Sequence, residues 1–307
     1  MIGSKASLAA FLLLSAQAAA GQTAGKTEAA PSGAAGMDLF LSGDADQTGV
    51  VRLGLNLDWR YEAPDRYQGV RIEKAWFDPF GQGRRERERV YLRGADRSGD
   101  WNWNGRIGTD GDTVLGAAAI HNNAPVRQEY FIEREIVETP QGLKRGIYYT
   151  FAGAAVDLPV DDRNTFTLLG GVQEFSGDNV RTHLRANYVH VIEPEWGLSG
   201  QIRTRLFRNS DPREFDYYSP RWYAQILPVL QLRRQVEGWR YLVAAGIGTQ
   251  RDSEQDWRRS SYFNTQFTSP ARGKWAFNAS FLYSETPTTS GLAYNYKQFT
   301  IGLTRVF

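Results

Sequence analysis

The residues in this sequence that are best suited to binding chemistry are arginines that recur with a spacing of two or four. Arg181 and Arg185 lie in one alternating stretch, and Arg203 and Arg205 lie in the next. A guanidinium group keeps its charge and offers five N–H donors to carboxylate or hydroxyl oxygens. Like charges this close repel one another unless water, carboxylates or a bound solute compensate them. The cluster therefore indicates either a polar binding track or a set of structural ion pairs.

Carboxylates that could complete such ion pairs lie in the stretch 125–137. Glu129, Glu133 and Glu135 share one face of this stretch with Arg127, because residues two apart on a strand point the same way. Together with the arginines they predict a lining that carries both signs of charge. Such a lining suits a hydrated polar solute better than an apolar one. The same residues would also serve if the pairs only held the fold in shape.

The three histidines, His121, His183 and His190, do not indicate an enzyme. A serine-hydrolase site needs a histidine within reach of a serine nucleophile. The sequence has neither a GxSxG motif nor the His-x-Ser motif of outer-membrane phospholipases. His183 is interpreted as a polar lining group between Arg181 and Arg185, and His121 as part of a turn. No catalytic residue is predicted.

A metal or cofactor site is not indicated either. The segment Asp110-Gly111-Asp112 resembles a fragment of a calcium loop, but the remaining ligand spacing is absent, so a turn is favoured. The chain has no Cys, which excludes disulfides and thiolate metal sites, and its net charge of +2 is too small to imply a nucleic-acid partner. We therefore expect no cofactor, no metal and no nucleic acid.

The elements that must position these side chains are strands, because apolar and polar residues alternate with a period of two beyond Met37. Gly, Pro, Asn and Asp punctuate the pattern at regular intervals. The segments predicted as strands are 37–41, 49–61, 68–77, 85–93, 100–107, 113–120, 125–137, 145–157, 164–174, 179–191, 196–206, 222–233, 239–249, 257–268, 273–284 and 292–307.

A soluble β-sandwich also alternates, so two further features decide between the classes. Aromatic residues gather at the predicted strand ends, as at Trp59 and Tyr61, where the interfacial girdles of a membrane barrel lie. The connections alternate between short and long, with 207–221 the longest. We therefore predict an all-β, transmembrane, antiparallel up-and-down β-barrel of about 16 strands. This class also fits a polar face that lines an aqueous lumen.

The two ends of the chain predict export to the bacterial outer membrane. Residues 1–20 have a lysine, a short apolar run and small residues before a cleavage site, which is the pattern of a signal peptide rather than a membrane anchor. Residues 21–36 are small and polar and are predicted to be a flexible leader, so that the barrel is assigned to 37–307. The terminal Phe307 on an alternating strand, broken once at Arg305, is interpreted as a signal to the barrel assembly machinery.

One segment resembles a known family. Asp216-Tyr217-Tyr218-Ser219-Pro220-Arg221-Trp222-Tyr223 opens a strand after the longest loop, and a short turn and an aromatic strand, from Val236 to Gly248, follow it. This resembles the C-terminal barrel of bacterial exopolysaccharide secretion porins, which export cellulose or poly-N-acetylglucosamine, over roughly 205–307. The resemblance implies a sixteen-stranded barrel that passes a growing sugar polymer. The chain departs from the family because it has no helical repeat of the tetratricopeptide kind.

The predicted function is a non-enzymatic outer-membrane pore for a secreted polysaccharide. A small-solute porin or a structural barrel is the alternative, and a lipid-modifying barrel enzyme is the least favoured. Outer-membrane lipid would surround the barrel, and a separate periplasmic scaffold and an inner-membrane synthase would complete the pathway. The residues predicted to contact polysaccharide in the lumen are Arg181, Arg185, Arg203, Arg205, Tyr223, Gln225, Glu129 and Glu133. Those predicted at the outer mouth are Tyr217, Tyr218 and Trp222.

Overall fold

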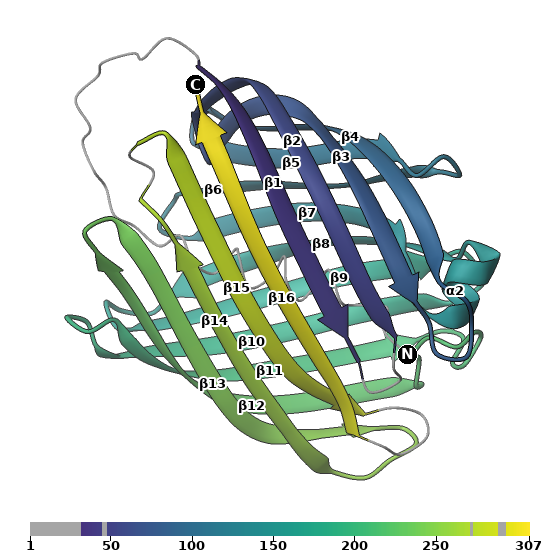
Figure 1. The fold of residues 1–307 in the computed structure, drawn as a ribbon. Helices are drawn as coiled ribbons and strands as arrows, with labels where there is room; N and C mark the ends of the chain where they lie inside the picture. Colours follow the sequence, from purple (N-terminus) through teal and green to yellow (C-terminus); the bar gives the residue numbers. More distant parts are fainter. Residues whose placement is uncertain (1–31, 45–47, 271–272, 288–292) are drawn as a thin grey trace.

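The chain folds into a closed barrel of sixteen antiparallel strands, in which each strand pairs with its neighbours in sequence. The computed structural model describes residues 32–44, 48–270, 273–287 and 293–307. Strand β1 (Ser32–Gly43) closes the ring against β16 (Ala293–Val306), with Ala34 opposite Val306 and Gly43 opposite Lys297 (Figure 1). The predicted fold class and strand number are therefore confirmed.

The remaining strands follow the predicted order with small differences at their ends. They are β2 (Gly49–Ala63), β3 (Arg66–Asp78), β4 (Arg85–Ser98), β5 (Trp101–Thr109), β6 (Val114–Asn122), β7 (Arg127–Ile136), β8 (Tyr148–Pro159), β9 (Asn164–Phe175), β10 (Val180–Glu193), β11 (Leu198–Asn209), β12 (Trp222–Val236), β13 (Trp239–Asp252), β14 (Arg258–Thr268) and β15 (Trp275–Pro287). Each overlaps the segment that the alternation predicts.

The start of the barrel lies earlier than predicted. Strand β1 begins at Ser32, so it includes residues 32–36, which the sequence analysis assigned to the leader. The small side chains of Gly33, Ala34 and Gly36 carry no hydrophobic signal, but their backbones lie between β2 and β16 and complete both ladders. The predicted signal peptide, residues 1–20, lies outside the described residues.

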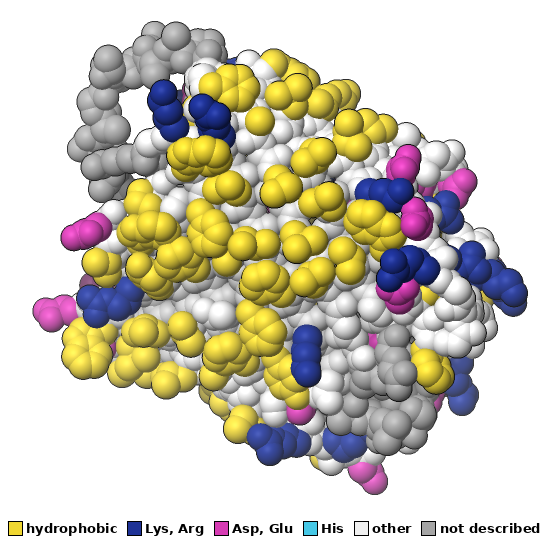
Figure 2. Space-filling view, in the orientation of Figure 1, with side chains coloured by type: hydrophobic (Ala, Val, Ile, Leu, Met, Phe, Trp, Pro, Cys, Tyr) yellow, Lys and Arg dark blue, Asp and Glu magenta, His cyan; other side chains and the backbone are white. Residues whose placement is uncertain are grey.

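The alternation of side chains gives the wall two faces. Along β10, Arg181, His183 and Arg185 are buried in the lumen, whereas Leu184 is 53% exposed on the exterior. The same holds around the barrel, so the exterior carries Leu, Ile, Val and aromatic side chains. Figure 2 shows these apolar side chains spread over the wall that faces the viewer, with most charged side chains toward its two ends. This arrangement matches the apolar band of a barrel that sits in lipid.

The connections differ between the two ends of the barrel. At the end where β1 begins, the turns are short; the one between β12 and β13 places Glu237 and Gly238 at φ values of 52° and 85°, as a tight hairpin turn requires. At the other end lie the longer loops 137–147 and 210–221. We call these the short-turn end and the long-loop end. The predicted asymmetry of the connections is confirmed for the described residues.

The loop 137–147 contains a short helix, α2 (Pro140–Arg145), at the long-loop end (Figure 1). Thr139 caps its N-terminus by accepting a hydrogen bond from the Gly142 N–H, and Gly146 ends it with a φ of 68°. In the described ranges, no helix has the length and apolar character needed to cross a membrane. The helix therefore belongs to the loop and not to the wall.

The C-terminal residue packs beside the start of the chain's first strand. The Phe307 N–H donates a 2.9 Å hydrogen bond to the Gly33 carbonyl, and the Phe307 ring lies where a side chain at residue 33 would clash. Arg305 also faces outward, and its guanidinium lies 5.5 Å from the centre of the Trp275 ring. This position at the rim lets the charged group reach water while its stem stays on the apolar surface. The break in the apolar pattern at Arg305 is therefore compatible with a lipid-facing last strand.

A pair of adjacent substitutions tests the two faces. Leu230, 55% exposed on the exterior of β12, and Gln231, 8% exposed in the lumen, point in opposite directions. We expect Leu230→Arg to destabilise the barrel in vesicles by about 2–4 kcal/mol, because the charge enters the apolar band. Gln231→Arg should cost less, because a long polar side chain is replaced by another in the lumen. Urea unfolding in lipid vesicles measures both, and equal losses would show that the faces are misassigned.

Candidate functional site

On the wall formed by β1–β8, charged side chains that point into the lumen form ion pairs with one another. Arg89 lies 3.0 Å from Glu73 and 3.1 Å from Glu135, and it is almost fully buried. Arg71 contacts Asp38 as well as Glu73. Further pairs on this wall are Arg93–Asp58 and Arg127–Asp157, and Arg52 on β2 pairs with Glu138 of the loop 137–147. Positive and negative charges therefore lie beside each other on this wall, where each can compensate the other's burial.

The predicted carboxylates belong to this network and not to the arginine cluster. Glu129 pairs with Arg127 on its own strand at 2.9 Å, and Glu133 accepts a hydrogen bond from the Tyr149 hydroxyl at 3.2 Å. Both carboxylates are buried in the lumen, as predicted. We expected Glu129, Glu133 and Glu135 as pairing partners for the arginines of the opposite wall. This hypothesis is wrong, because Arg127, the Tyr149 hydroxyl and Arg89 contact these carboxylates instead.

The opposite wall, on β10 and β11, gathers the arginines. Arg181, Arg185, Arg203 and Arg205 all point into the lumen, as the alternation predicted. The strand register places Arg185 directly opposite Arg205. Arg203 donates from Nε to the Gln201 Oε1 at 2.9 Å, and its guanidinium lies 4.9 Å from the centre of the Tyr262 ring. The described contacts of Arg203 and Arg205 are thus with amides and rings.

Tyr223 and Gln225 extend this polar surface along β12. The Tyr223 hydroxyl donates to the Gln250 Oε1 at 2.7 Å, and the Gln225 amide donates to the Ser260 hydroxyl at 2.7 Å. The register places Gln225 opposite Arg205 on one side and opposite Gln250 on the other. The row continues through Arg258 on β14. We call this row, Arg185–Arg205–Gln225–Gln250–Arg258, the polar belt.

The loop 210–221 lies at the long-loop end, and Arg181 on β10 anchors it to the wall. The Arg181 guanidinium donates to the Asn209 Oδ1 at 2.8 Å and to the Tyr218 carbonyl at 2.5 Å. It also lies 4.6 Å from the centre of the Phe207 ring and contacts the Tyr217 ring. Arg181 therefore holds the loop as well as lining the lumen.

Tyr217 and Tyr218 lie at the long-loop end, where the outer mouth was predicted, but both side chains are buried inside the barrel rather than lining an opening. Tyr217 stacks on Phe175 with ring centres 4.2 Å apart. The Tyr218 hydroxyl donates to the Asp252 Oδ2 at 2.6 Å. Burial and this acceptor raise the pKa of Tyr218, so its hydroxyl stays protonated and keeps donating. The Ser-Pro pair that follows turns the chain back into β12, which draws both rings inward.

Trp222 points away from the lumen, which also corrects its predicted place at the mouth. Even-numbered residues of β12 face outward, and Trp222 is 38% exposed with the Arg251 guanidinium 5.7 Å from its ring centre. An indole at the end of a strand on the exterior suits the membrane interface. Trp222 therefore belongs to an aromatic girdle and not to a solute path.

The loops 137–147 and 210–221 are fastened to each other across the long-loop end. Asp216 accepts hydrogen bonds from the Thr139 hydroxyl at 2.5 Å and from the Gln141 N–H at 2.7 Å. Leu143 of α2 packs in one cluster with lumen residues that include Phe77 and Tyr91. We call these two loops the plug, because their buried side chains occupy the long-loop end of the lumen.

The plug was not predicted from the sequence, although one local signal for it was present. The run Thr139-Pro140 with Gly146 has the capping residue, the first-turn proline and the terminal glycine of a short helix. That signal indicates the helix α2 but not that it packs against the loop 210–221. The contact with Asp216 joins residues about 75 positions apart, which a local pattern cannot reveal.

The histidines do not form a catalytic arrangement. His183 Nε2 lies 3.1 Å from the Gln173 Oε1, and its ring packs against Phe151 and Phe207. His190 faces outward and shares the Asn164 amide oxygen with the Tyr188 hydroxyl. Within the described residues, no group of three His, Asp or Glu side chains could hold a metal ion. The contacts of His183 and His190 are those of structural polar groups.

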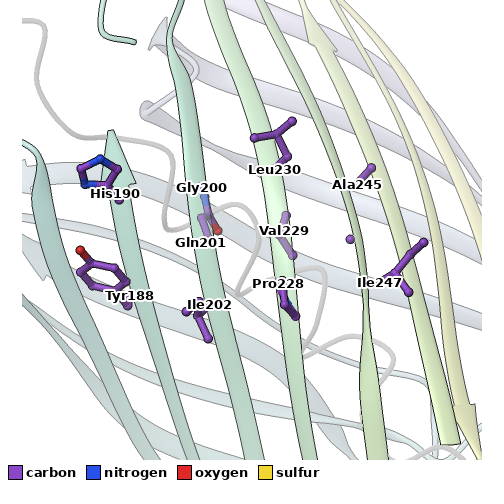
Figure 3. Close-up of a pocket in the computed structure, with 11 residues that line it drawn as sticks. Tyr188, His190, Gly200, Gln201, Ile202, Pro228, Val229, Leu230, Ala245 and Ile247 are labelled. Carbon is purple, nitrogen blue, oxygen red and sulfur yellow. The ribbon is translucent and has the colours of Figure 1, made fainter. Parts of the chain in front are cut away.

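The hollow drawn in Figure 3 lies in the exterior of the wall and is separate from the lumen. It measures about 570 Å³ and is formed by β10–β13, with the exposed side chains of Ile202, Leu230 and Ile247 around the small residues Gly200 and Ala245. Small side chains between large ones leave a depression that membrane lipid would fill. The candidate site is therefore the polar belt in the lumen.

Comparison with known proteins supports the fold. No protein-family model and no curated protein matches the chain. A bacterial polysaccharide outer membrane secretin has a similar structure, with 14% sequence identity, a TM-score of 0.65, and coverage of 89% of this chain and 98% of that one. OccK5 (OpdH) of Pseudomonas aeruginosa shares 9% identity with a TM-score of 0.46, over 90% and 98% of the two chains. OccAB3 of Acinetobacter baumannii shares 10% identity with a TM-score of 0.44, over 90% and 99%. At these identities the first likeness shows a common barrel fold.

The attachment of the plug can be tested by removing its shared acceptor. Asp216→Ala leaves the Thr139 hydroxyl and the Gln141 N–H without their partner. Each lost hydrogen bond to a charged group is worth about 1.5–3 kcal/mol, so the loop 210–221 should open more often. We expect proteases to cut this loop at least tenfold faster in the folded barrel.

The matched control for this experiment is Asp211→Ala, which removes one carboxylate from an exposed position of the same loop. Its cleavage rate should stay close to that of the unchanged protein. Equal acceleration by both variants would mean that the charge of the loop, and not the contact with α2, sets its mobility.

Proposed function

We propose that this barrel is a non-enzymatic passage for a secreted polysaccharide across the bacterial outer membrane. The observation that carries the proposal is the polar belt, which lines one wall of the lumen with guanidinium and amide groups. Such groups are hydrogen-bond donors and acceptors for the hydroxyl oxygens of sugars. The rings of Tyr223 and Tyr262 lie beside them and offer flat faces for sugar rings.

Two further observations support the proposal. The similar structure named above is described as a polysaccharide secretin, and its fold covers 89% of this chain. The lumen walls also differ in a way that suits transport: β1–β8 hold their charges in ion pairs, whereas β10–β14 present donors in rows. A passage needs lining groups that a solute can contact on entering and release on leaving.

The orientation follows from the loops. The short-turn end would face the periplasm, as in barrels of this class, and the plug would lie outside. Polymer would enter at the short-turn end, pass the polar belt and displace the plug. Outer-membrane lipid would surround the apolar exterior, and assembly would use Phe307 as the signal to the barrel assembly machinery. A separate periplasmic scaffold and an inner-membrane synthase would deliver the polymer.

The proposal can be tested by locking the plug. The protein contains no Cys, so Thr139→Cys with Asp216→Cys creates the only two thiols in the chain. A short, reducible thiol crosslinker applied to cells should join the loops and stop the release of extracellular polymer. Adding a reductant should restore release, because the wall is untouched. The measurement is total extracellular carbohydrate from cells whose own copy of the gene is deleted.

Each single-Cys variant is the control, because the crosslinker cannot join the loops there. Continued release from the crosslinked double variant would contradict the proposal that polymer leaves through this lumen. A steady ionic current through the crosslinked barrel in planar bilayers, combined with normal polymer release, would favour the alternative of a small-solute porin.

A further inference from the structure

Three arginines point out of the barrel at its long-loop end. Arg208 lies near the end of β11, Arg251 near the end of β13 and Arg259 near the start of β14. Residues two apart on a strand share a face, and Leu206 and Ile247, at the same parity as Arg208 and Arg251, are 44% and 62% exposed on the exterior. We call Arg208, Arg251 and Arg259 the exterior arginines.

The exterior arginines lie around an aromatic ring of the membrane interface. The register places Arg208 directly opposite Trp222 on β12. The Arg251 guanidinium lies 5.7 Å from the centre of the Trp222 ring. Arg259 lies opposite Thr249, which is the next outward position to Arg251 along β13. Because an exterior indole at a strand end marks the interface, these positive charges lie at the level of the lipid headgroups.

Carboxylates compensate the exterior arginines only in part. Arg251 lies 3.4 Å from Asp256, whose side chain is 94% exposed to solvent. Glu285, on the exterior of β15, accepts hydrogen bonds from a backbone N–H and from a tyrosine hydroxyl. In the part of the chain that the structure describes, no ion pair involves Arg208 or Arg259. This stretch of the exterior is therefore positively charged.

The hollow of Figure 3 lies on the same strands, further toward the short-turn end. Ile202 on β11 is six residues from Arg208, and Pro228 on β12 is six residues from Trp222. A strand rises about 3.3 Å per residue, and strands of such barrels tilt by roughly 40°, so six residues descend about 15 Å. That depth is half of a hydrocarbon core about 30 Å thick, which is the depth that one acyl chain reaches.

The hollow exists because two residues of the wall interrupt its regular pattern. The ladder between β12 and β13 stops at Ile226 and resumes at Val229, since Pro228 has no N–H to donate. Gly200, on the neighbouring strand β11, leaves the place of an outward side chain empty. A Cβ atom there would meet only the Ile192 Cδ1, at 3.5 Å, which is an ordinary contact. Backbone crowding therefore does not require a glycine at this position.

We infer that the exterior arginines and the hollow together bind one phosphorylated glycolipid of the outer leaflet. The inference uses the orientation proposed above and does not depend on the passage of polymer. Guanidinium groups form strong charge-assisted hydrogen bonds with phosphate. Arg208 and Arg259 lie three strands apart, which is about 14 Å at a strand spacing of about 4.8 Å. A sugar headgroup with a phosphate at each end can contact both, whereas a single phosphate cannot.

The tail of the same lipid would follow the apolar side chains that lie between the two parts of the site. Leu206 and Ile226 are 44% and 45% exposed on the exterior between the arginines and the hollow. An acyl chain that runs along them ends in the hollow of about 570 Å³. The site thus differs from the rest of the lipid-facing wall because a positively charged rim and a depression lie on the same strands.

The inference is tested by native mass spectrometry of the folded barrel released from detergent micelles. The probes are diphosphorylated lipid A, phosphatidylglycerol and phosphatidylethanolamine, each added over a range of concentrations. We expect the first molecule of lipid A to bind at least tenfold more tightly than either phospholipid. Raising the ammonium acetate concentration fivefold should weaken the binding of lipid A, because salt screens contacts between exposed charges.

The headgroup contacts are tested by Arg208→Gln/Arg259→Gln, which keeps hydrogen-bonding capacity and removes two charges. This variant should lose at least tenfold in affinity for lipid A. Its matched control is Arg234→Gln/Arg240→Gln, which removes the same charge from exposed positions at the short-turn end of β12 and β13. The control should bind lipid A within twofold of the unchanged protein.

The tail contact is tested by Gly200→Leu, which fills the hollow and leaves the arginines in place. We expect this variant to lose at least fivefold in affinity for lipid A. Its matched control is Gly170→Leu on the exterior of β9, where an added Cβ meets no atom within 4 Å and lies outside the hollow. Heat-modifiable migration on a gel verifies that each variant is a folded barrel.

Three results would overturn the inference: phosphatidylglycerol binding as tightly as lipid A, equal affinity of the two arginine variants, or equal affinity of the two glycine variants. The first would assign the site to anionic lipids in general, and the third would separate the arginines from the hollow. None of these results bears on the crosslinking experiment, which asks whether polymer leaves through the lumen.

Discussion

The wall of this protein depends on backbone hydrogen bonding between neighbouring strands. In an apolar surrounding no water can satisfy an exposed N–H or C=O group, so a sheet must close on itself. The pairing of β1 with β16 meets this requirement and leaves no free edge in the ring. Closure also fixes the register of every strand, since a shift by one residue would turn all its side chains to the other face. The position of each lumen residue follows from this constraint.

The register explains why the two walls of the lumen differ. On β3, β4 and β7 it brings Glu73 and Glu135 within reach of Arg89, and opposite charges cancel. On β10 and β11 it brings Arg185 opposite Arg205, and like charges meet. The same backbone rule thus produces one wall on which opposite charges are paired and one wall on which two arginines occupy opposite positions.

Most of the barrel could be predicted from the sequence, because strand identity and side-chain direction depend on a local period of two. Arg203 and Arg205 were placed correctly in the lumen for that reason. The start of β1 was misplaced because Gly33 and Gly36 have no side chain to reveal a face. Trp222 was misplaced because it is the first residue of its strand. An aromatic residue at that position can lie at the membrane interface or at the mouth of the pore, and the sequence does not distinguish the two.

Contacts between distant parts of the ring could not be predicted in this way. Glu129 was expected to reach the arginines of the opposite wall, but local alternation gives no distance across a lumen, and Arg127 on the same strand is nearer. The inward fold of Tyr217 and Tyr218 depends on Phe175, Asp252 and Arg181, which lie on other strands. A loop has no period, so its direction is settled only by such tertiary contacts.

The plug and the wall are held by interactions of very different total strength. Each strand shares a ladder of backbone hydrogen bonds with two neighbours, and opening one ladder exposes polar groups along its length. The loop 210–221 is held mainly by separate side-chain contacts, among them those of Arg181, Glu214, Asp216 and Tyr218, each worth about 0.5–3 kcal/mol. A segment held in this way can open at a lower free energy than the whole fold. Loss of these loop contacts therefore leaves the strand ladders, and with them the polar belt and its register, in place.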